Sequence, residues 1–318
     1  MINTLLDSIF IGKPKQSENI LIFPLYGKNQ DNSNISFFKN LTDAFEDGEV
    51  VIKEKEPADV NELSFKNTGA KPVFIMDGEY LKGAKQDRTV NLSILAPASQ
   101  EIILPVSCVE AGRWSSSKKP TFDPYDKLHY AKAKARRHAS VSRSFDSSNK
   151  AKSNQREVWD HINNKEAIMR QRSNTQSMKD MYDRNKKRLI SITNNLLPDN
   201  TQIGSLYCVN NEIVGFDIFT NSALHKSYSS KIIHSVAIDA METISIPQDL
   251  KIDLMEIVIS FLEEVKRLEV KRYDSVGLGS VYRGLSRNIS ASSLTFDEMN
   301  IHACAFLVDR SITMRIIK

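Results

Sequence analysis

Four polar or reactive side chains border two short stretches in which aliphatic residues occupy alternate positions. The stretches span residues 90–94 and 102–106. The polar residues continue the same alternation outward, as Gln86 and Arg88 before the first stretch and Cys108 and Glu110 after the second. A guanidinium group binds anions, a thiolate is a nucleophile, and a carboxylate transfers protons. These residue types together would suit a pocket that binds and processes an anionic ligand.

An antiparallel hairpin would bring these side chains to one end of a sheet, because alternate residues of a strand share a face. Residues 96–100 suit a five-residue hairpin loop. Centring it on Ala98 gives the pairs Ile94–Ile102, Leu92–Leu104, Val90–Val106, Arg88–Cys108 and Gln86–Glu110. A preceding turn at 82–84 would bring Tyr80 to the same end. Buried charge is costly unless it is paired or used, so we expect a polar pocket there.

Glu110 is the candidate acid or base of this predicted pocket, since it extends an apolar face. The alternative is a salt bridge from Glu110 to Arg88 or Arg113 that only fixes the hairpin. Cys108 is a candidate nucleophile if Arg88 favours its thiolate form. The alternative is an inert core cysteine, because free cysteine is among the most buried residue types.

Arg88 and Arg113 are the candidates for binding a phosphate or carboxylate in fork geometry. Trp114 follows directly and could stack on a base or another ring. The alternative is that Trp114 covers the core, with Arg113 lying on its face. His302 interrupts the apolar stretch 301–308 and is either a second proton carrier or a hydrogen-bonded core residue.

Known cofactor and metal motifs are missing from the sequence. The six histidines show no HxH or HExxH spacing, and the three cysteines form no CxxC pair. The dinucleotide fingerprint and the P-loop pattern do not occur in their usual contexts. We therefore expect neither a metal nor a cofactor.

The composition is that of a globular protein in a reducing compartment. Of the 318 residues, 41% are hydrophobic and 26% are charged. The start has no secretory pattern, and no apolar run is long enough to span a membrane. Three widely spaced cysteines argue against a disulfide framework, so a cytoplasmic location is expected.

The net charge of +4 conceals a basic middle segment. Residues 131–190 contain sixteen Lys or Arg and six Asp or Glu. Such a segment could contact a nucleic acid or another polyanion. The alternative is a solvated helix surface. Aromatic residues in the segment are too sparse for a convincing base-stacking platform.

The order of patterns predicts an α+β fold rather than a regular alternation of strands and helices. Residues 1–125 should form an antiparallel, β-rich core that includes the hairpin. Residues 126–200 should form basic helices with a mobile loop near 136–152. Residues 201–318 combine a hairpin, helices and strands, and should pack on the first part to form one unit.

Two strings carry a family resemblance: GAKQDR at 83–88 and PVSCVEAGRW at 105–114. They resemble a bacterial domain family named for its association with ADP-ribosylglycohydrolases and rhodanese-phosphatase proteins, with weaker similarity extending to 301–306. The resemblance implies a place in NAD or ADP-ribose metabolism, in stress or conflict responses. It points to Gln86, Arg88, Cys108, Glu110, Arg113, Trp114 and His302. Asp87 departs from the uncharged residue expected there.

The leading hypothesis is therefore a protein that binds a phosphorylated nucleoside related to ADP-ribose or NAD, with hydrolysis or processing of that ligand as a further expectation. Arg88 and Arg113 would bind the phosphates, with Gln86 beside them, and Trp114 or Tyr80 would stack on a ring. The resemblance alone supplies this ligand class. One alternative is a nucleic-acid-associated protein that uses residues 131–190. Another is a scaffold protein in which the polar end of the hairpin is a buried ion-pair network.

Overall fold

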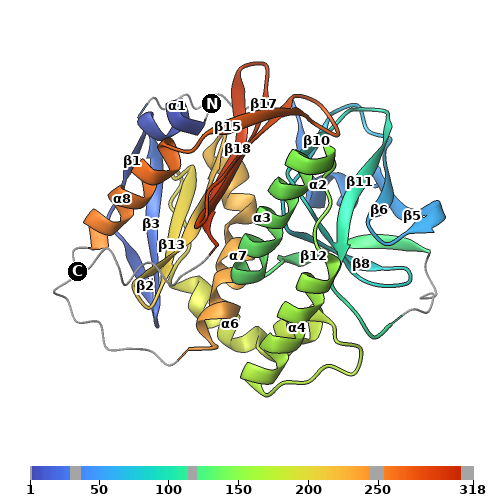
Figure 1. The fold of residues 1–318 in the computed structure, drawn as a ribbon, viewed down its shortest axis with the longest axis horizontal. Coiled ribbons are helices and arrows are strands. Elements are labelled where there is room, and N and C mark those ends of the chain that lie inside the picture. Colours follow the sequence, from blue (N-terminus) through green and yellow to red (C-terminus); the bar gives the residue numbers. More distant parts are fainter. Residues whose placement is uncertain (1, 29–36, 114–119, 244–253, 309–318) are drawn as a thin grey trace. The chain divides into compact units, whose positions relative to one another are not determined.

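The computed structural model describes residues 2–28, 37–113, 120–243 and 254–308 (Figure 1). Their contacts divide the chain into two compact units. Unit 1 comprises Met1–Asn34, Lys187–Tyr273 and Ser280–Lys318, and unit 2 comprises Ile35–Lys186 and Asp274–Gly279. Each unit combines helices with sheets that are mainly antiparallel, which confirms the predicted α+β class.

Unit 1 is built on a nine-stranded sheet with the order β1-β3-β13-β14-β18-β17-β16-β15, and β2 also pairs with β3. Its strands are β1 (Ile9–Ile11), β2 (Lys15–Ser17), β3 (Ile20–Gly27), β13 (Gly204–Val209), β14 (Glu212–Phe219), β15 (Val270–Asp274), β16 (Ser280–Leu285), β17 (Ile289–Phe296) and β18 (Met299–Leu307). Its helices are α1 (Ile2–Asp7), α6 (Lys186–Asn194, which begins at the boundary), α7 (Ser222–Ala240) and α8 (Leu254–Lys266). Strands β13 and β14 form the hairpin predicted within residues 201–318.

Helices cover both faces of this sheet. Phe216 and Ile218 of β14 belong to a hydrophobic core that also contains residues of α1 and α8. The residues between and after them, Asp217 and Phe219, point to the other face because side chains alternate along a strand. Helix α7 contacts β3, β13 and β14, and its Tyr228 ring stacks on Phe219 on that second face. The second face therefore combines aromatic and polar side chains.

His225 of α7 is a buried titratable group on this second face. Its Nε2 lies 3.0 Å from the Ser205 hydroxyl, which accepts a hydrogen bond of 2.9 Å from the Gln202 amide. Burial lowers the pKa of His225 from 6.5 to about 4. The imidazole is therefore neutral near pH 7, and protonating it in the folded state costs free energy.

Unit 2 contains a closed barrel with the order β11-β6-β5-β12-β8-β9 and a small sheet with the order β10-β7-β4 (Figure 1). Its strands are β4 (Lys39–Asn40), β5 (Val50–Asp59), β6 (Glu62–Asn67), β7 (Val73–Ile75), β8 (Glu79–Gly83), β9 (Arg88–Val90), β10 (Ile94–Ala96), β11 (Glu101–Cys108) and β12 (Thr121–Leu128). Its helices are α2 (Leu41–Glu46), α3 (Ala131–Ser148), α4 (Gln155–Met169) and α5 (Met178–Arg184).

The predicted hairpin register is correct for two of its five pairs, while the predicted pair Gln86–Glu110 lies beyond the ladder and Glu110 instead bridges Ser177. Val90 pairs with Val106 and Arg88 with Cys108. The two pairs nearest the predicted loop, Ile94–Ile102 and Leu92–Leu104, are wrong. Strand β10 leaves the barrel and pairs with β7, and Ile102 and Leu104 of β11 pair with residues of β6. The chain departs at Asn91, whose side chain accepts a hydrogen bond from Ser107 and donates one to the Ala151 carbonyl.

Helix α3 replaces the loop that the composition of residues 136–152 predicts. The segment has few large apolar residues, but its alanines are buried and allow close packing. The guanidinium of Arg137 is buried as well and forms an ion pair with Asp77. Small side chains and one buried ion pair thus stabilise a helix in a segment whose composition predicts a polar loop.

The two units also differ from the predicted segments 1–125, 126–200 and 201–318. Strand β3 pairs along six residues with β13, so the first residues of the chain belong with its last third. Helices α3 to α5 belong to the unit that contains the barrel. Pairing between strands so distant in sequence leaves no local signal. None of the described helices is long and apolar enough to cross a membrane.

The low pKa of His225 predicts a specific acid sensitivity. A folded-state pKa below the unfolded value of 6.5 contributes stability above that value, and this stability is lost as the pH falls towards 4. The full difference corresponds to about 3 kcal/mol. His225→Gln should therefore lose less stability than the wild type between pH 7 and pH 5, as measured by urea unfolding. Parallel losses in the two proteins would contradict this prediction.

Candidate functional site

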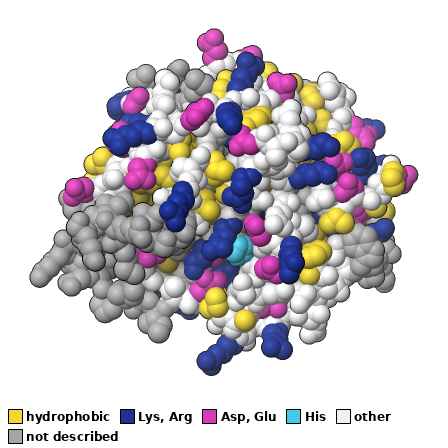
Figure 2. All heavy atoms as spheres, in the orientation of Figure 1, with side chains coloured by type: hydrophobic (Ala, Val, Ile, Leu, Met, Phe, Trp, Pro, Cys, Tyr) yellow, Lys and Arg dark blue, Asp and Glu magenta, His cyan; other side chains and the backbone are white. Residues whose placement is uncertain are grey.

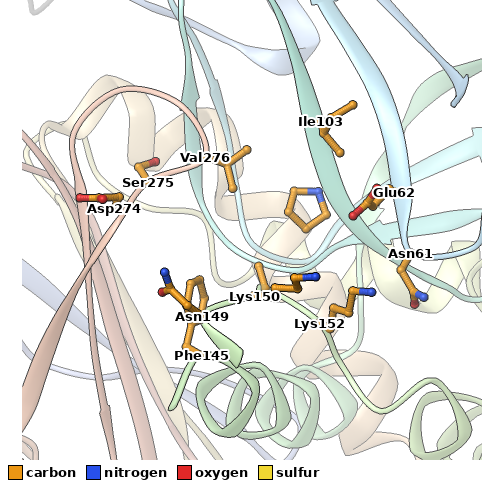
Figure 3. Close-up of a pocket in the computed structure, with 12 residues that line it drawn as sticks. Asn61, Glu62, Ile103, Phe145, Asn149, Lys150, Lys152, Asp274, Ser275 and Val276 are labelled. Carbon is orange, nitrogen blue, oxygen red and sulfur yellow. The ribbon is translucent and has the colours of Figure 1, made fainter. Parts of the chain in front are cut away.

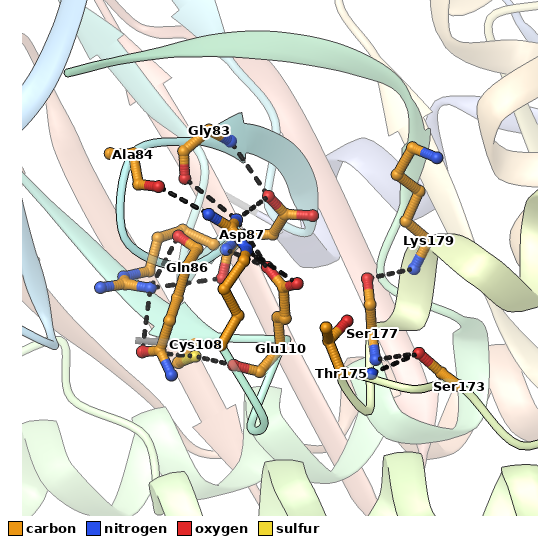
Figure 4. Close-up of polar contacts among 12 residues, drawn as sticks. Gly83, Ala84, Gln86, Asp87, Cys108, Glu110, Ser173, Thr175, Ser177 and Lys179 are labelled. Carbon is orange, nitrogen blue, oxygen red and sulfur yellow. Dashed lines mark hydrogen bonds and ion pairs between the residues drawn. The ribbon is translucent and has the colours of Figure 1, made fainter. Parts of the chain in front are cut away.

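A cluster of buried polar residues occupies the end of the barrel where β8, β9 and β11 meet (Figure 4). Its strongly buried members are Tyr80, Gln86, Asp87, Arg88, Cys108 and Glu110. Arg113 lies at its edge, with 22% of its side chain exposed. The structure thus brings together every residue predicted from the two strings except Trp114, which lies outside the described residues.

Glu110 is bound by Arg113 in fork geometry. Arg113 Nε donates to both carboxylate oxygens, at 2.9 and 3.0 Å, and its Nη2 donates to Oε2 at 2.7 Å. The same carboxylate accepts the backbone N–H of Asp87 at 3.1 Å. Of the two salt bridges left open by the sequence, the one to Arg113 is present.

Asp87 is a second carboxylate of the cluster, although the family pattern gave it no role. It accepts the Tyr80 hydroxyl at 2.5 Å, the Gly83 N–H at 3.0 Å and Arg113 Nη2 at 3.2 Å. Burial raises the pKa of Asp87, although the Tyr80 hydrogen bond opposes this shift. Burial also raises the pKa of Tyr80 well above 10, so its hydroxyl remains a donor to Asp87.

Arg88 lies on the face of β9 that points towards the barrel core, with its guanidinium 5.9 Å from the centre of the Phe122 ring. Its Nη1 donates to the Gln86 carbonyl at 2.8 Å, and its Nη2 lies 3.7 Å from Glu54. Within the part of the chain that the structure describes, Nε and Nη2 have no hydrogen-bond partner. A buried guanidinium that is only partly satisfied costs stability, and such costs are often found at functional sites.

The Cys108 thiol has two acceptors within reach of its single S–H, the Glu110 carbonyl at 3.1 Å and Gln86 Oε1 at 3.2 Å. Burial raises the pKa of Cys108, and the nearby charge of Arg88 only partly offsets this effect. The thiol is therefore the main form near neutral pH, which favours the inert alternative. The amide of Gln155 on α4 binds both the N–H and the carbonyl of Cys108, at 2.7 and 2.8 Å, and fixes the end of β11.

The residues before α5 line the other side of the cluster (Figure 4). Ser177 forms a β-bridge with Glu110, and its hydroxyl lies 3.4 Å from that of Tyr80. Gly112 donates its N–H to the Thr175 carbonyl at 2.7 Å, and a Cβ at residue 112 would lie only 2.9 Å from that oxygen. The glycine of the PVSCVEAGRW string is thus required by a close approach of two backbones, rather than by chemistry.

A separate pocket of about 290 Å³ lies beside β11 in unit 2 (Figure 3). It combines lysine ammonium groups, amides and apolar side chains. Its lining includes Asn61, Ile103, Phe145, Lys150, Lys152 and Asp274. None of the residues predicted from the two strings lines this pocket, and its residues carry no motif that would have indicated a site.

His302 belongs to unit 1, where its Nε2 lies 3.1 Å from Asp217 Oδ1. The sequence grouped His302 with Glu110 only through the family pattern. Within its own unit, the His302 side chain contacts Asp217 and Phe219.

Several Lys and Arg side chains of the basic segment 131–190 are buried within the protein. Lys134, Arg137 and Lys165 are buried, and the Lys165 ammonium lies 4.5 Å from the centre of the Tyr130 ring. On the face drawn in Figure 2, Lys and Arg side chains are interspersed with Asp and Glu rather than gathered in one continuous patch. These observations favour a solvated helix surface over a polyanion site.

Comparison with family models gives a match over residues 8–306 to ARPP-1, the "ARG and Rhodanese-Phosphatase-superfamily-associated Protein domain". The chain belongs to this family. The ARPP-1 match covers both strings at the barrel end and confirms the resemblance drawn from them. The family's name records an association with ADP-ribosylglycohydrolase and rhodanese-phosphatase proteins. Comparisons with curated proteins and with solved structures gave no significant match.

The environment of Cys108 in this ARPP-1 domain predicts low thiol reactivity. Because burial raises its pKa and excludes reagents, iodoacetamide at pH 8 should leave Cys108 unmodified in the folded protein. Peptide mass spectrometry checks this, with protein alkylated in urea as the control in which all three cysteines react. Selective labelling of Cys108 in the folded protein would instead support its role as a nucleophile.

Proposed function

We propose that this protein binds a phosphorylated nucleoside related to ADP-ribose or NAD at the barrel end of unit 2 and hydrolyses it. The supporting observation is the fork that Arg113 forms on Glu110 at the edge of a buried cluster. The same planar fork fits a carboxylate or a phosphate. The family association supplies the ADP-ribose class, which the geometry alone would not specify.

Ligand binding would proceed by exchange of anions at Arg113. A phosphate oxygen pair would take the fork, and the Glu110 carboxylate would be released from its cation and become able to accept a proton. Arg113 is the cluster member best suited to this exchange, because part of its side chain is exposed while Glu110 and Asp87 are buried. Arg88, with two nitrogens lacking hydrogen-bond partners among the described residues, would add positive potential behind the phosphate.

Glu110 would then act as the general base that takes a proton from water as the water oxygen attacks the phosphorus of the bound phosphate. The P–O bond to the rest of the ligand would break, and the displaced group would leave with that oxygen. Gln86 and Tyr80 would line the site. A positioned carboxylate contributes roughly 10²- to 10⁴-fold to such a step. Cys108 is proposed as a positioning residue through its bonds to Gln86 and Glu110, since its thiol is the form favoured by burial. No step is assigned to His302.

The binding proposal predicts that affinity depends on the Arg113 fork. Isothermal titration calorimetry of the full chain with ADP-ribose, NAD and AMP should show heat with at least one of them. Arg113→Lys keeps the charge but removes the bidentate geometry, and should weaken that binding by about tenfold or more. Arg143→Lys, at an exposed position on α3, is the matched control and should bind like the wild type.

A double variant locates the binding site. Lys150→Ala with Lys152→Ala removes the cations of the separate pocket beside β11. Loss of binding in that variant, with full binding by Arg113→Lys, would move the site away from the barrel end. The absence of heat with every ligand in the wild type would end the ligand assignment.

The catalytic proposal predicts that Glu110→Gln abolishes turnover while the protein remains folded. The amide keeps the size of the side chain and can still accept hydrogen bonds from Arg113, but it is not a base. Product formation from ADP-ribose and NAD is measured by chromatography, and folding by circular dichroism and thermal melting. Asp87→Asn is the matched variant, and it should retain more activity if Glu110 is the base.

The same variant tests the scaffold alternative. If the cluster only holds the barrel closed, Glu110→Gln should lower the melting temperature and leave any activity of the folded fraction unchanged. That result, or wild-type protein without turnover of either compound, would contradict hydrolysis at this site.

A further inference from the structure

We propose that Asp217, His302 and Cys304 form a binding site for a divalent transition metal, with zinc the best match to their chemistry. The site lies wholly in unit 1 and is independent of the ligand proposed for unit 2. It revises the expectation of a metal-independent protein that the histidine spacings favoured.

The sheet register places the three side chains together. His302 and Cys304 are two residues apart on β18, so they share one face of the sheet. Asp217 of β14 is the direct cross-strand partner of Cys304. This is the face opposite the core formed with α1 and α8, to which Phe216 and Ile218 belong. Three potential ligands thus come from adjacent positions on two paired strands.

The donor atoms converge on one point. One oxygen of Asp217, one ring nitrogen of His302 and the sulfur of Cys304 all lie within 4.8 Å of one another. The Asp217–His302 contact itself is 3.1 Å. In a relay of the Asp–His–Cys type, the carboxylate and the sulfur would use different nitrogens of the imidazole. In this cluster a single nitrogen of His302 lies within 4.8 Å of both the carboxylate oxygen and the sulfur, as a shared cation would require.

The spacing is close to that of a metal site. Bond lengths of about 2.0–2.3 Å at tetrahedral zinc place its ligand atoms roughly 3.3–3.8 Å apart. Small side-chain rotations would bring the three donors from their present separations to that geometry. They sit on paired strands rather than on a loop, which limits the cost of fixing their positions.

The donor types and charges also match zinc. One thiolate, one imidazole and one carboxylate form a mixed S, N and O set with a charge of −2, which neutralises a divalent cation. Ser292 of β17, whose hydroxyl lies 3.5 Å from the Cys304 sulfur, is positioned as an outer hydrogen-bond partner of the thiolate. Three protein ligands leave a fourth position for water or another ligand, as in catalytic rather than structural zinc sites.

Burial shields the three side chains from water. Asp217 and His302 are each 1% exposed, and Cys304 is fully buried. The ring of His302 is held 4.7 Å from that of Phe219, which restricts the imidazole. The competing explanation is a hydrogen-bonded Asp–His pair beside an inert cysteine. The two explanations differ in the role of Cys304, because the metal proposal requires all three residues to bind one ion.

Cobalt titration of the full-length chain, after removal of metals with a chelator, tests the site directly. The wild type should bind one equivalent of Co²⁺ with a near-ultraviolet thiolate charge-transfer band and visible bands typical of tetrahedral coordination. Zn²⁺ should displace the cobalt and bleach both signals. Metal analysis of the protein as purified, before chelation, should find up to one zinc per chain.

Variants assign the ligands. Cys304→Ser should abolish the charge-transfer band, and His302→Gln and Asp217→Asn should each weaken binding by more than the roughly 10- to 100-fold that loss of an outer-shell partner costs. Cys208→Ser and His225→Gln are matched controls, because both residues are buried in the same unit and neither belongs to the cluster. Both controls should bind cobalt like the wild type.

Several outcomes would overturn the proposal without relying on a folded variant. Wild-type protein that takes up no stoichiometric Co²⁺ or Zn²⁺ would do so, as would cobalt binding without a thiolate band. A band that persists in Cys304→Ser and disappears in Cys208→Ser would place the metal elsewhere. Circular dichroism of each variant distinguishes loss of a ligand from loss of the fold.

Discussion

A carboxylate removed from water needs a cation or several hydrogen-bond donors, and this requirement determines how the end of the barrel is built. Glu110 is satisfied by Arg113 and by the backbone of Asp87. Asp87 is satisfied in turn by Tyr80, Gly83 and Arg113. These bonds join the ends of β8 and β9 to the segment that follows β11. Removing Arg113 would leave two buried carboxylates without their cation, so the cluster depends on this one residue.

The sequence predicts this cluster well because strand alternation is a strict rule. Aliphatic residues at every second position determine which face of β9 and β11 is buried, and a slip of one residue would expose all of them. The observed pairs Val90–Val106 and Arg88–Cys108 are therefore the ones predicted. The prediction fails at the other end of the hairpin, where Ile94 pairs with Ile75. An apolar strand can pair with any matching edge, and the choice between edges depends on contacts distant in sequence.

The remaining differences have the same origin. Nothing near β3 in the sequence indicates that it pairs with β13, and hence that the first residues of the chain join unit 1. Nothing in the composition of residues 136–152 shows that Arg137 forms a buried ion pair with Asp77. This ion pair makes a helix favourable there. A search for metal motifs in the sequence does not find the Asp217–His302–Cys304 cluster, because its members come from segments distant in sequence. Two of its members form only a short H-x-C pattern, and the third lies on another strand.

Charge balance links the structure of the barrel end to its proposed chemistry. Arg88 and Arg113 face three carboxyl groups, those of Glu54, Asp87 and Glu110. Full ionisation would leave an excess of negative charge in a largely buried volume. Burial raises the pKa of Asp87, and the neighbouring charge of Glu110 adds to this shift. An anion that takes the Arg113 fork would add to the excess. Its binding would therefore be coupled to proton uptake at Asp87, whose pKa burial already raises.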